Sequence, residues 1–370
     1  MGDDTFHSPV RVNHLTQVLL FGPAPFLTGD QRARLENALR KSSDPREMLR
    51  MAARHRLSSA LFYNLDRLGL LETLPKQEQR LLSQIGRIAQ HISDLQTREA
   101  GSIVEELSKT KTRFRLLKGI HFAWAVYPDP RLREYRDIDI LLPGDRMDHV
   151  EQFLTASGYV RGTIKPGSAK PWGMSDEEVA AYENSSGEKA PYVKLVRATE
   201  LAGLREACQS VPELPVSFAG GKPFLYAKVD LHWSLTRHGW EMRQIWSDAD
   251  EFEFCGNKAL GLRAEDLVWY LALKVYNETM WHNLPSFRYL HDLAVLAQRR
   301  DLNWGFVSRT CRRRGIAAEL FYALKCVQVL RPERVPDWLL MSLSKRIPSE
   351  GLGNLTPKLF GNPVLAKVLA

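Results

Sequence analysis

The stretch Arg136-Asp137-Ile138-Asp139-Ile140-Leu141-Leu142 decides how the fold is interpreted. Its apolar residues predict a β-strand, and successive side chains on a strand point to opposite faces. Asp137 and Asp139 therefore share one face, while the isoleucines beside them can face a core. Two carboxylates held side by side repel each other unless a proton or a divalent cation lies between them. Oxygen ligands of this kind suit Mg²⁺ or Mn²⁺, which in turn suit nucleoside triphosphates.

An edge strand with two solvent-facing aspartates is the alternative interpretation of the same residues. The strand is otherwise strongly apolar, which is typical of a central strand. Two carboxylates on a central strand would cost free energy without a compensating cation. A metal site that includes Asp137 and Asp139 is therefore the favoured hypothesis, and the motif indicates metal-assisted phosphoryl chemistry.

A possible phosphate site lies upstream, in Leu116-Leu117-Lys118-Gly119. This segment is predicted to end a strand and to open a helix. Free backbone N–H groups at a helix start bind phosphate, and glycine lets the ligand approach the backbone. Lys118 adds a positive charge. An ordinary strand-to-helix turn has the same sequence signature, so Lys118 and Gly119 are phosphate-binding candidates.

A third carboxylate, Asp230, lies on an apolar strand that is predicted over residues 224–235. It either completes a metal site, as carboxylates do in two-metal enzymes, or takes a proton as a general base. The alternative is an aspartate at a strand end that pairs with an arginine. His232 follows at the spacing that places it on the same face. Histidines of this kind are more often packed or hydrogen-bonded than bound to a ligand, and His232 is kept as a candidate contact of the nucleotide.

The coarse pattern predicts three regions. Residues 1–110 are expected to be helical after an irregular lead-in at 1–28, and residues 261–370 are expected to form a C-terminal helical domain. Between them, residues 111–260 alternate strand and helix signals and predict a catalytic core with a small mixed sheet. The fold class is therefore α+β. Residues near 161–222 are rich in Gly, Pro, Ser and charge, and are expected to be an insertion or lid with partial order.

Bulk composition narrows the partners and the location. The formal net charge is +8 and the isoelectric point is near 9.3, which favours anionic partners, nucleotides as well as nucleic acids. No apolar run approaches the roughly 20 residues that span a bilayer, so a cytoplasmic protein without membrane contact is expected. The four cysteines have no paired spacing of the kind that zinc sites need. Arg309, Arg312, Arg313 and Arg314 form a possible basic face, but no aromatic platform accompanies it, so nucleic acid is possible and not favoured.

The combined pattern resembles the DNA polymerase β-like nucleotidyltransferase superfamily. More narrowly, it is similar to the bacterial "uncharacterised nucleotidyltransferase" family. The resemblance rests on Leu116-Leu117-Lys118-Gly119, Tyr127-Pro128-Asp129-Pro130-Arg131 and the aspartate strand. It extends to Gly158-Tyr159, to Leu231-His232-Trp233 and to Arg288-Tyr289-Leu290-His291-Asp292-Leu293, and thus covers most of the chain.

The resemblance implies metal-dependent transfer of a nucleoside monophosphate from a nucleoside triphosphate, with release of pyrophosphate. Two Mg²⁺ or Mn²⁺ ions are implied, and ATP is the favoured triphosphate. Asp137 and Asp139 would bind both ions, Asp230 would serve the catalytic one, and Lys118 and Gly119 would lie beside the triphosphate. The superfamily usually has Ser after the glycine, whereas Ile120 stands here. The triphosphate contact is therefore expected to depend on Lys118 and on Arg133 or Arg136.

The acceptor is not encoded in any motif of this sequence. A hydroxyl or similar group on a small molecule, a peptide or a protein is the leading hypothesis. The basic C-terminal helices permit an RNA-directed nucleotidyltransferase. The missing serine and the same helices also motivate a nucleotide- or RNA-binding module without turnover. Retention of all three carboxylates argues against that last alternative.

Overall fold

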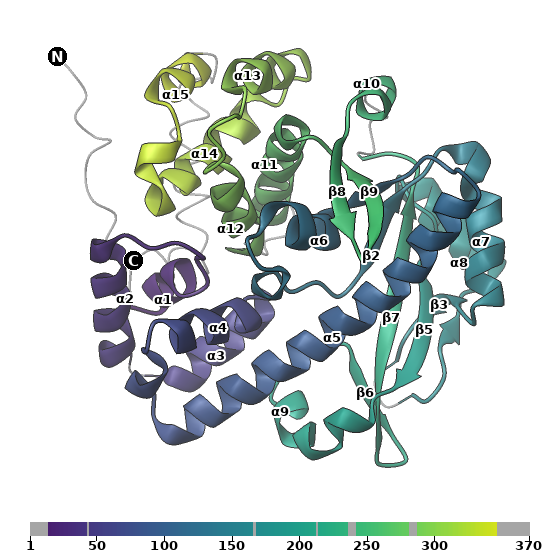
Figure 1. The fold of residues 1–370 in the computed structure, drawn as a ribbon, viewed down its shortest axis with the longest axis horizontal. Coiled ribbons are helices and arrows are strands. Elements are labelled where there is room, and N and C mark those ends of the chain that lie inside the picture. The colour runs from purple at the N-terminus through teal and green to yellow at the C-terminus, as the bar shows by residue number, and fades with distance from the viewer. Residues whose placement is uncertain are drawn as a thin grey trace. The chain divides into compact units, whose positions relative to one another are not determined.

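The structure is a computed structural model, and it describes residues 14–42, 44–165, 168–211, 214–235, 242–280 and 287–345. Along the described chain, helices precede and follow a segment that carries the strands (Figure 1), which confirms the α+β class. The helices are α1 (His14–Phe21), α2 (Gly29–Lys41), α3 (Pro45–Arg54), α4 (Ser58–Arg67), α5 (Lys76–Lys109), α6 (Lys118–His121), α7 (Met147–Ala156), α8 (Asp176–Ser185), α9 (Arg205–Gln209), α10 (Met242–Ser247), α11 (Ala264–Met280), α12 (Phe287–Leu296), α13 (Trp304–Arg313), α14 (Ala317–Leu330) and α15 (Asp337–Ser344). The strands are β1 (Arg115–Leu117), β2 (Ile138–Leu141), β3 (Val160–Thr163), β4 (Trp172–Gly173), β5 (Tyr192–Arg197), β6 (Val216–Ala219), β7 (Lys222–His232), β8 (Asp250–Phe254) and β9 (Asn257–Gly261).

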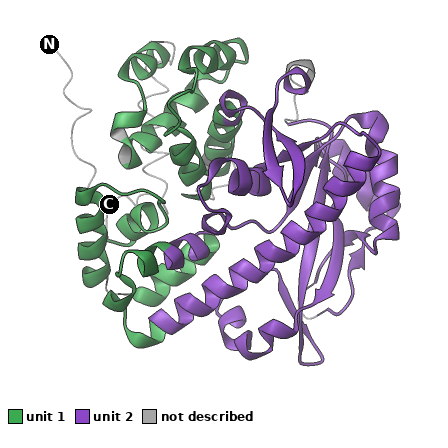
Figure 2. Ribbon diagram, viewed as in Figure 1, with its two compact units in different colours: residues 1–55, 64–78, 268–370 green, residues 56–63, 79–267 purple. Residues whose placement is uncertain are grey.

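The chain divides into two compact units (Figure 2). The first, helical unit comprises residues 1–55, 64–78 and 268–370, and the second comprises residues 56–63 and 79–267. The second unit contains all the strands of the described chain. It also contains every residue that the sequence singled out for the metal and nucleotide site.

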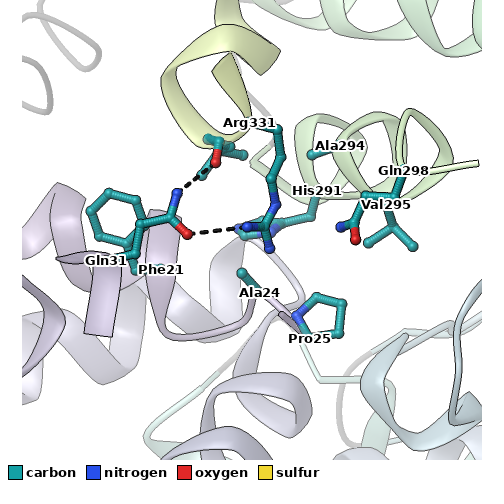
Figure 3. Close-up of a pocket in the computed structure, with 10 residues that line it drawn as sticks. Phe21, Ala24, Pro25, Gln31, His291, Ala294, Val295, Gln298 and Arg331 are labelled. Atoms are coloured by element: carbon teal, nitrogen blue, oxygen red, sulfur yellow. Dashed lines mark hydrogen bonds between the residues drawn. The ribbon is translucent and has the colours of Figure 1, made fainter. Parts of the chain in front are cut away.

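Buried apolar residues and a few polar contacts hold the first unit together. Val18, Leu19 and Leu35 have no exposed surface. The Nε2 atom of His291 on α12 donates a hydrogen bond to the carbonyl oxygen of Leu19 on α1, at 2.9 Å. Gln31 on α2 lines a small pocket (Figure 3), where it contacts the end of α14. Its Nε2 donates to the carbonyl oxygen of Leu330 at 2.7 Å, and its Oε1 accepts from Nη1 of Arg331 at 3.1 Å.

The expectation of an irregular lead-in over residues 1–28 was wrong for residues 14–21, which form α1. The apolar run Val18–Phe21 supplies the reason, since its side chains are buried and a helix satisfies their backbone groups. Residues 1–13 lie outside the described residues. Helix α3 begins after Asp44, whose side chain caps it by accepting from the N–H of Glu47 at 2.9 Å.

The sheet of the second unit has the strand order β1-β2-β7-β5-β3-β4, and β6 also pairs with β7. The β2–β7 pair is parallel and the other pairs are antiparallel, so the sheet is mixed as predicted. Strand β2 has a neighbour on each side, which confirms that the aspartate strand is not an edge strand. The register places Asp139 opposite Asp230 on β7 and opposite Leu117 on β1.

Helix α5 runs along the sheet (Figure 1). Gln96 on this helix joins it to the sheet. The side-chain amide of Gln96 donates to the carbonyl oxygens of Arg136 at 3.1 Å and of Tyr226 at 3.0 Å. The helix packs through an apolar face, on which Ile85, Ile88 and Ile92 are buried. One buried amide thus connects the segment that enters β2 with the middle of β7.

The stretch 161–222 is better ordered than its composition indicated. Its described residues form most of β3, all of β4, α8, β5, α9 and β6, and the start of β7, and its strands belong to the sheet of the second unit. Residues 166–167 and 212–213 lie outside the described part. Strand β7 ends at His232, earlier than the predicted end at 235. The N–H groups of Trp233 and Ser234 bond instead to the carbonyl oxygen of Gly187, at 3.1 and 3.2 Å.

The predicted basic face on α13 is smaller than expected. The Arg314 guanidinium lies 4.1 Å from the centre of the Trp269 ring, and Arg312 donates to the Ser342 hydroxyl. Arg309 and Arg313 are exposed. Arginine stacks readily on aromatic faces, which is why sequence spacing alone overstated this surface. None of the described helices is long and apolar enough to cross a lipid bilayer.

Two buried histidines predict an acid-sensitive fold. Burial lowers the pKa of His121 to about 3, and burial together with nearby Arg54 lowers the pKa of His55 to about 4. In the unfolded chain both titrate near 6.5. Between these values the unfolded state binds more protons, so the free energy of unfolding falls as the pH drops below 6.5, by up to about 1.4 kcal/mol per pH unit for each histidine.

Urea unfolding at several pH values between 4.5 and 7 measures this slope. His121→Leu places an apolar group of similar size beside Phe252. We expect this variant to reduce the slope by the contribution of one proton, up to about 1.4 kcal/mol per pH unit. An unchanged slope in this variant contradicts the assignment of that proton to His121.

Candidate active site

The junction between β1 and α6 carries Lys118. Because β1 pairs with β2 so that Leu117 lies opposite Asp139, the next residue can reach across, and Lys118 Nζ donates to Asp139 Oδ1. Lys118 has φ = 48°, in the left-handed region, which costs a non-glycine residue about 1–2 kcal/mol. Backbone strain of this kind is concentrated at functional sites.

The helix predicted after this junction is present. Helix α6 spans Lys118–His121 and continues as a π-helical turn over Phe122–Val126. Ile120, at the position where the superfamily resemblance implied a serine, has no exposed surface. Lys118 is therefore the polar side chain that this turn presents to Asp139.

Asp139 is fully buried and its two oxygens have different surroundings. Oδ1 accepts from Lys118 and from Nε2 of His232 at 2.8 Å, while Oδ2 has no hydrogen-bond partner among the described residues. Burial raises the pKa of Asp139, but the nearby Lys118 ammonium and His232 outweigh burial and hold it below its usual range. Asp139 is therefore an ionised carboxylate with one oxygen unused.

The two carboxylate oxygens of Asp230 on β7 also have different surroundings. Its Oδ2 accepts from Lys228 Nζ at 2.7 Å, and its Oδ1 is buried without a partner among the described residues. Burial, followed by the charges of Asp139 and Asp137, raises the pKa of Asp230, and Lys228 opposes this shift. The parallel register sets Asp230 directly beside Asp139, so the two unused oxygens belong to neighbouring carboxylates.

Asp137 lies just before β2 and is half-buried. Its Oδ1 is 3.6 Å from Nη1 of Arg56. Burial raises the pKa of Asp137, but the Arg56 guanidinium together with the Lys228 and Lys118 ammonium groups outweighs burial, and the net shift is downward. All three predicted carboxylates are thus in the second unit, each beside a basic side chain.

His232 connects Asp139 to a residue that sequence reasoning missed. Its Nδ1 lies 2.9 Å from Oε2 of Glu188, and its Nε2 lies 2.8 Å from Asp139. Ionised carboxylates only accept, so a ring between two of them carries a proton on both nitrogens. Burial and Lys118 lower the pKa of His232, whereas its bonds to Asp139 and Glu188 raise it, and the net shift is upward. Despite burial, the bond from His232 lowers the pKa of Glu188 to about 2.

Gly119 has a packing role that is visible in the structure. A Cβ atom at this position would lie 2.5 Å from Cβ of Tyr135, which is closer than side-chain atoms approach each other. Tyr135 is itself buried, and its hydroxyl bonds with that of Thr97. A glycine is therefore required at the strand-to-helix turn, whether or not a phosphate binds there.

Arg133 and Arg136 are buried rather than open to solvent. Arg136 forms an ion pair with Oε1 of Glu134, with Nε at 2.8 Å and Nη2 at 2.6 Å, and Arg133 donates to the carbonyl oxygen of Glu134. These contacts stabilise the loop before β2. A role for either arginine in phosphate binding stays a prediction, and it requires these contacts to rearrange.

Three further residues of the site, Arg56, Lys228 and Glu188, escaped the sequence reasoning. Lys228 carried a readable signal, because Lys228, Asp230 and His232 alternate along β7 and share one face. Arg56 and Glu188 carried none. Arg56 is distant in sequence from the carboxylates, and Glu188 lies in the stretch that composition marked as an insertion.

The charges of the site balance. Four carboxylates face four basic groups: Asp137, Asp139, Asp230 and Glu188 against Arg56, Lys118, Lys228 and His232. Among the described residues, no group of three or more His, Cys, Asp or Glu side chains is arranged to hold a metal ion. Even so, the unused buried oxygens of Asp139 and Asp230 are the hard donors that Mg²⁺ and Mn²⁺ prefer. These two oxygens fit a divalent cation when Lys118 and Lys228 move away from the carboxylates.

The fold and the site together define an α+β protein whose mixed sheet presents paired carboxylates and ammonium groups on adjacent strands. Such a site is typical of an enzyme that acts on phosphate groups. A model of the family described as "Uncharacterised nucleotidyltransferase" matches residues 41–332, well over half of the chain. The chain therefore belongs to this family and is a nucleotidyltransferase. Neither the curated proteins nor the solved structures gave a significant match.

Proposed function

We propose that this enzyme moves a nucleoside monophosphate from a nucleoside triphosphate, with ATP as the favoured donor, to a hydroxyl or similar group. The acceptor would be a small molecule, a peptide or a protein, and pyrophosphate would be released. We also assign the core to the polymerase β-like superfamily. The observation that carries the proposal is the register of β2 and β7, which sets Asp139 beside Asp230 with one buried oxygen of each left without a partner among the described residues.

The roles of the carboxylates follow from their surroundings. Asp137, Asp139 and Asp230 would hold two divalent cations, which would neutralise charge on the α-phosphate and on the departing pyrophosphate. The acceptor oxygen would form a bond to the α-phosphorus while the bond to the bridging oxygen breaks. Asp230 would take the acceptor's proton, and its raised pKa suits a general base better than an unperturbed carboxylate does.

Lys118 and Lys228 would have a second role on the donor side. In the structure they neutralise Asp139 and Asp230. When cations take over that task, the two ammonium groups become available for the triphosphate, whose charge they complement. Gly119 would keep the turn close enough for Lys118 to do so, and His232 would stay beside Asp139.

The balanced charge of the site predicts that the cation and the nucleotide bind together. A divalent cation alone would leave the site with excess positive charge, and a triphosphate alone would meet carboxylates. We expect an ATP analogue with a methylene group between its α and β phosphorus atoms to bind at least about tenfold more tightly with Mn²⁺ than with a chelator, a coupling of about 1.4 kcal/mol. Titration calorimetry of the full chain measures this, and equal affinities contradict it.

Label transfer tests the proposed reaction itself. The full chain is incubated with each α-labelled triphosphate and with Mg²⁺ or Mn²⁺, alone and with a cell extract. Label on a small molecule, peptide or protein, absent in the variant that combines Asp137→Ala and Asp139→Ala, is the expected result. Binding of nucleotide without any transfer overturns the proposal in favour of a binding module.

An RNA acceptor is the second candidate, because exposed Arg309 and Arg313 offer positive charge to a phosphate backbone. Label confined to RNA in the same experiment supports it. Arg312 and Arg314 are engaged by other side chains, so the basic face is smaller than the sequence indicated. An RNA acceptor is therefore less favoured than the sequence alone indicated. A cytoplasmic location likewise remains a prediction from composition.

A further inference from the structure

The segment between α8 and β5 is hydrogen-bonded to the end of the strand that carries Asp230. The N–H of Lys189 donates to the carbonyl oxygen of Leu231 at 2.8 Å, and the N–H of Trp233 donates to that of Gly187 at 3.1 Å. Glu188 and His232 face each other as a bridge between the two segments. The backbone therefore fixes Glu188 beside His232 before any side-chain contact is considered.

The side chains extend this connection in both directions. Glu188 Oε2 lies 2.9 Å from His232 Nδ1, and Glu188 Oε1 accepts from the Tyr182 hydroxyl at 2.5 Å. On its other side, His232 contacts Asp139 Oδ1 at 2.8 Å. A continuous chain of hydrogen bonds thus runs from Tyr182, the α8 residue at its outer end, to the buried carboxylate of Asp139.

This chain restricts the rotation of Asp139. With Oδ1 held by Lys118 and His232, the carboxylate plane is fixed and Oδ2 is the oxygen that remains for another ligand. An imidazole with no partner on Nδ1 would be free to turn away from Oδ1. In metal sites, residues behind the ligands orient them in the same way, and their loss costs about 10–100-fold in metal affinity or activity.

We propose that Glu188 is a positioning residue of the active site: acting through His232, it holds Asp139 so that Oδ2 stays directed to the cation that accompanies the triphosphate. The inference rests on the proposed function and deepens it. It also gives the stretch 161–222 a task at the site, because that stretch supplies both Glu188 and Tyr182.

Glu188→Gln tests the proposal, since glutamine keeps the size of the side chain and replaces the charge-assisted bond to His232 Nδ1 with a weaker neutral one. The matched control is Glu183→Gln, a neighbouring glutamate that contacts Lys189 at 3.6 Å and the N–H of Ala190 at 3.2 Å and makes no described contact with His232. The first readout is the Mn²⁺ concentration that gives half-maximal binding of the methylene ATP analogue. We expect it to rise about 10–100-fold in Glu188→Gln and to stay within about twofold of wild type in the control.

A second readout separates positioning from a merely structural contact. With α-labelled ATP and water as the acceptor, Glu188→Gln is expected to lower kcat at saturating Mn²⁺ about tenfold or more while KM for ATP changes little. In a His232→Asn background the same substitution should have no further effect, because the connection is already broken. Tyr182→Phe, which keeps the charge of Glu188, should shift both readouts in the same direction and by less.

The outcomes are distinguishable. Three outcomes overturn the positioning role and leave the proposed function intact. They are wild-type readouts in Glu188→Gln, an equal loss in the Glu183→Gln control, and a loss that is as large in the His232→Asn background as in wild type. If Glu188→Gln does not fold, unchanged readouts in Tyr182→Phe overturn the role instead. A wild-type chain that neither binds the analogue with Mn²⁺ nor transfers label overturns the proposed function itself.

Discussion

Asp139→Asn is expected to lower the rate of nucleotidyl transfer by about a thousandfold or more, because a carboxylate that helps hold catalytic cations contributes several kcal/mol to transition-state stabilisation. Asparagine has nearly the same shape and keeps one oxygen for Lys118 and His232. It has no second carboxylate oxygen to replace Oδ2, which is buried without a partner among the described residues. Label transfer from α-labelled ATP at saturating Mn²⁺ measures the rate.

Asp129→Asn is the matched control for this substitution. Asp129 lies in the loop before β2 and pairs with Arg131, at 2.6 Å, rather than with the site. We expect its transfer rate to remain within about threefold of wild type, because the contacts of Asp129 are with Arg131 and not with the carboxylates of the site. A rate for Asp139→Asn within about tenfold of wild type contradicts the role assigned to Asp139.

Gly119→Ala is expected to damage both stability and activity. The added Cβ would lie 2.5 Å from Cβ of buried Tyr135, so the turn or the tyrosine must move. Overpacking of this kind lowers the free energy of unfolding by about 1–3 kcal/mol. Movement of the turn also displaces Lys118 from Asp139, and a displacement of about 1 Å near a reacting centre can cost about a hundredfold in rate.

Gly203→Ala provides the comparison for that substitution. A Cβ atom at Gly203 would have no neighbouring atom within 4 Å, and the backbone there is outside the left-handed region, so alanine is accommodated. We expect a change of no more than about 0.5 kcal/mol in the free energy of unfolding, measured by urea titration of both variants. Equal stability of Gly119→Ala and Gly203→Ala contradicts the close contact with Tyr135.

Local alternation predicted the acidic strands well. Asp139 and Asp230 each interrupt an apolar run, and each lies on a strand as predicted, although the strand of Asp230 spans 222–232 and not 224–235. Their neighbouring positions in the sheet could not be derived from alternation alone. The family resemblance implied that they meet, and the register of β2 and β7 brings them side by side.

The basic partners of the carboxylates were harder to predict. Lys228 shares a strand face with Asp230, so alternation could have revealed it. Arg56 meets Asp137 only through tertiary folding, because it lies far away in the chain. No periodicity or spacing rule connects two such residues.

The order of the stretch 161–222 was underestimated for a related reason. Its Gly, Pro and Ser content indicated weak local preferences, but strand β5 pairs with β7 along its whole length, and the segment around Glu188 bonds to the end of β7. Pairing with a strand distant in the chain supplied the order that local sequence did not. Strand propensity is well known to depend on such tertiary context.

The most direct test of the central claim compares α-labelled with γ-labelled ATP in parallel incubations of the full chain with Mg²⁺ or Mn²⁺. A nucleotidyltransferase that uses the carboxylates of β2 and β7 transfers the α label to the acceptor and releases the γ label in pyrophosphate. We predict this result, and we predict that Asp139→Asn loses it. Transfer of the γ label with the α label retained in ADP would show a phosphoryl transfer of a different class and would contradict the account.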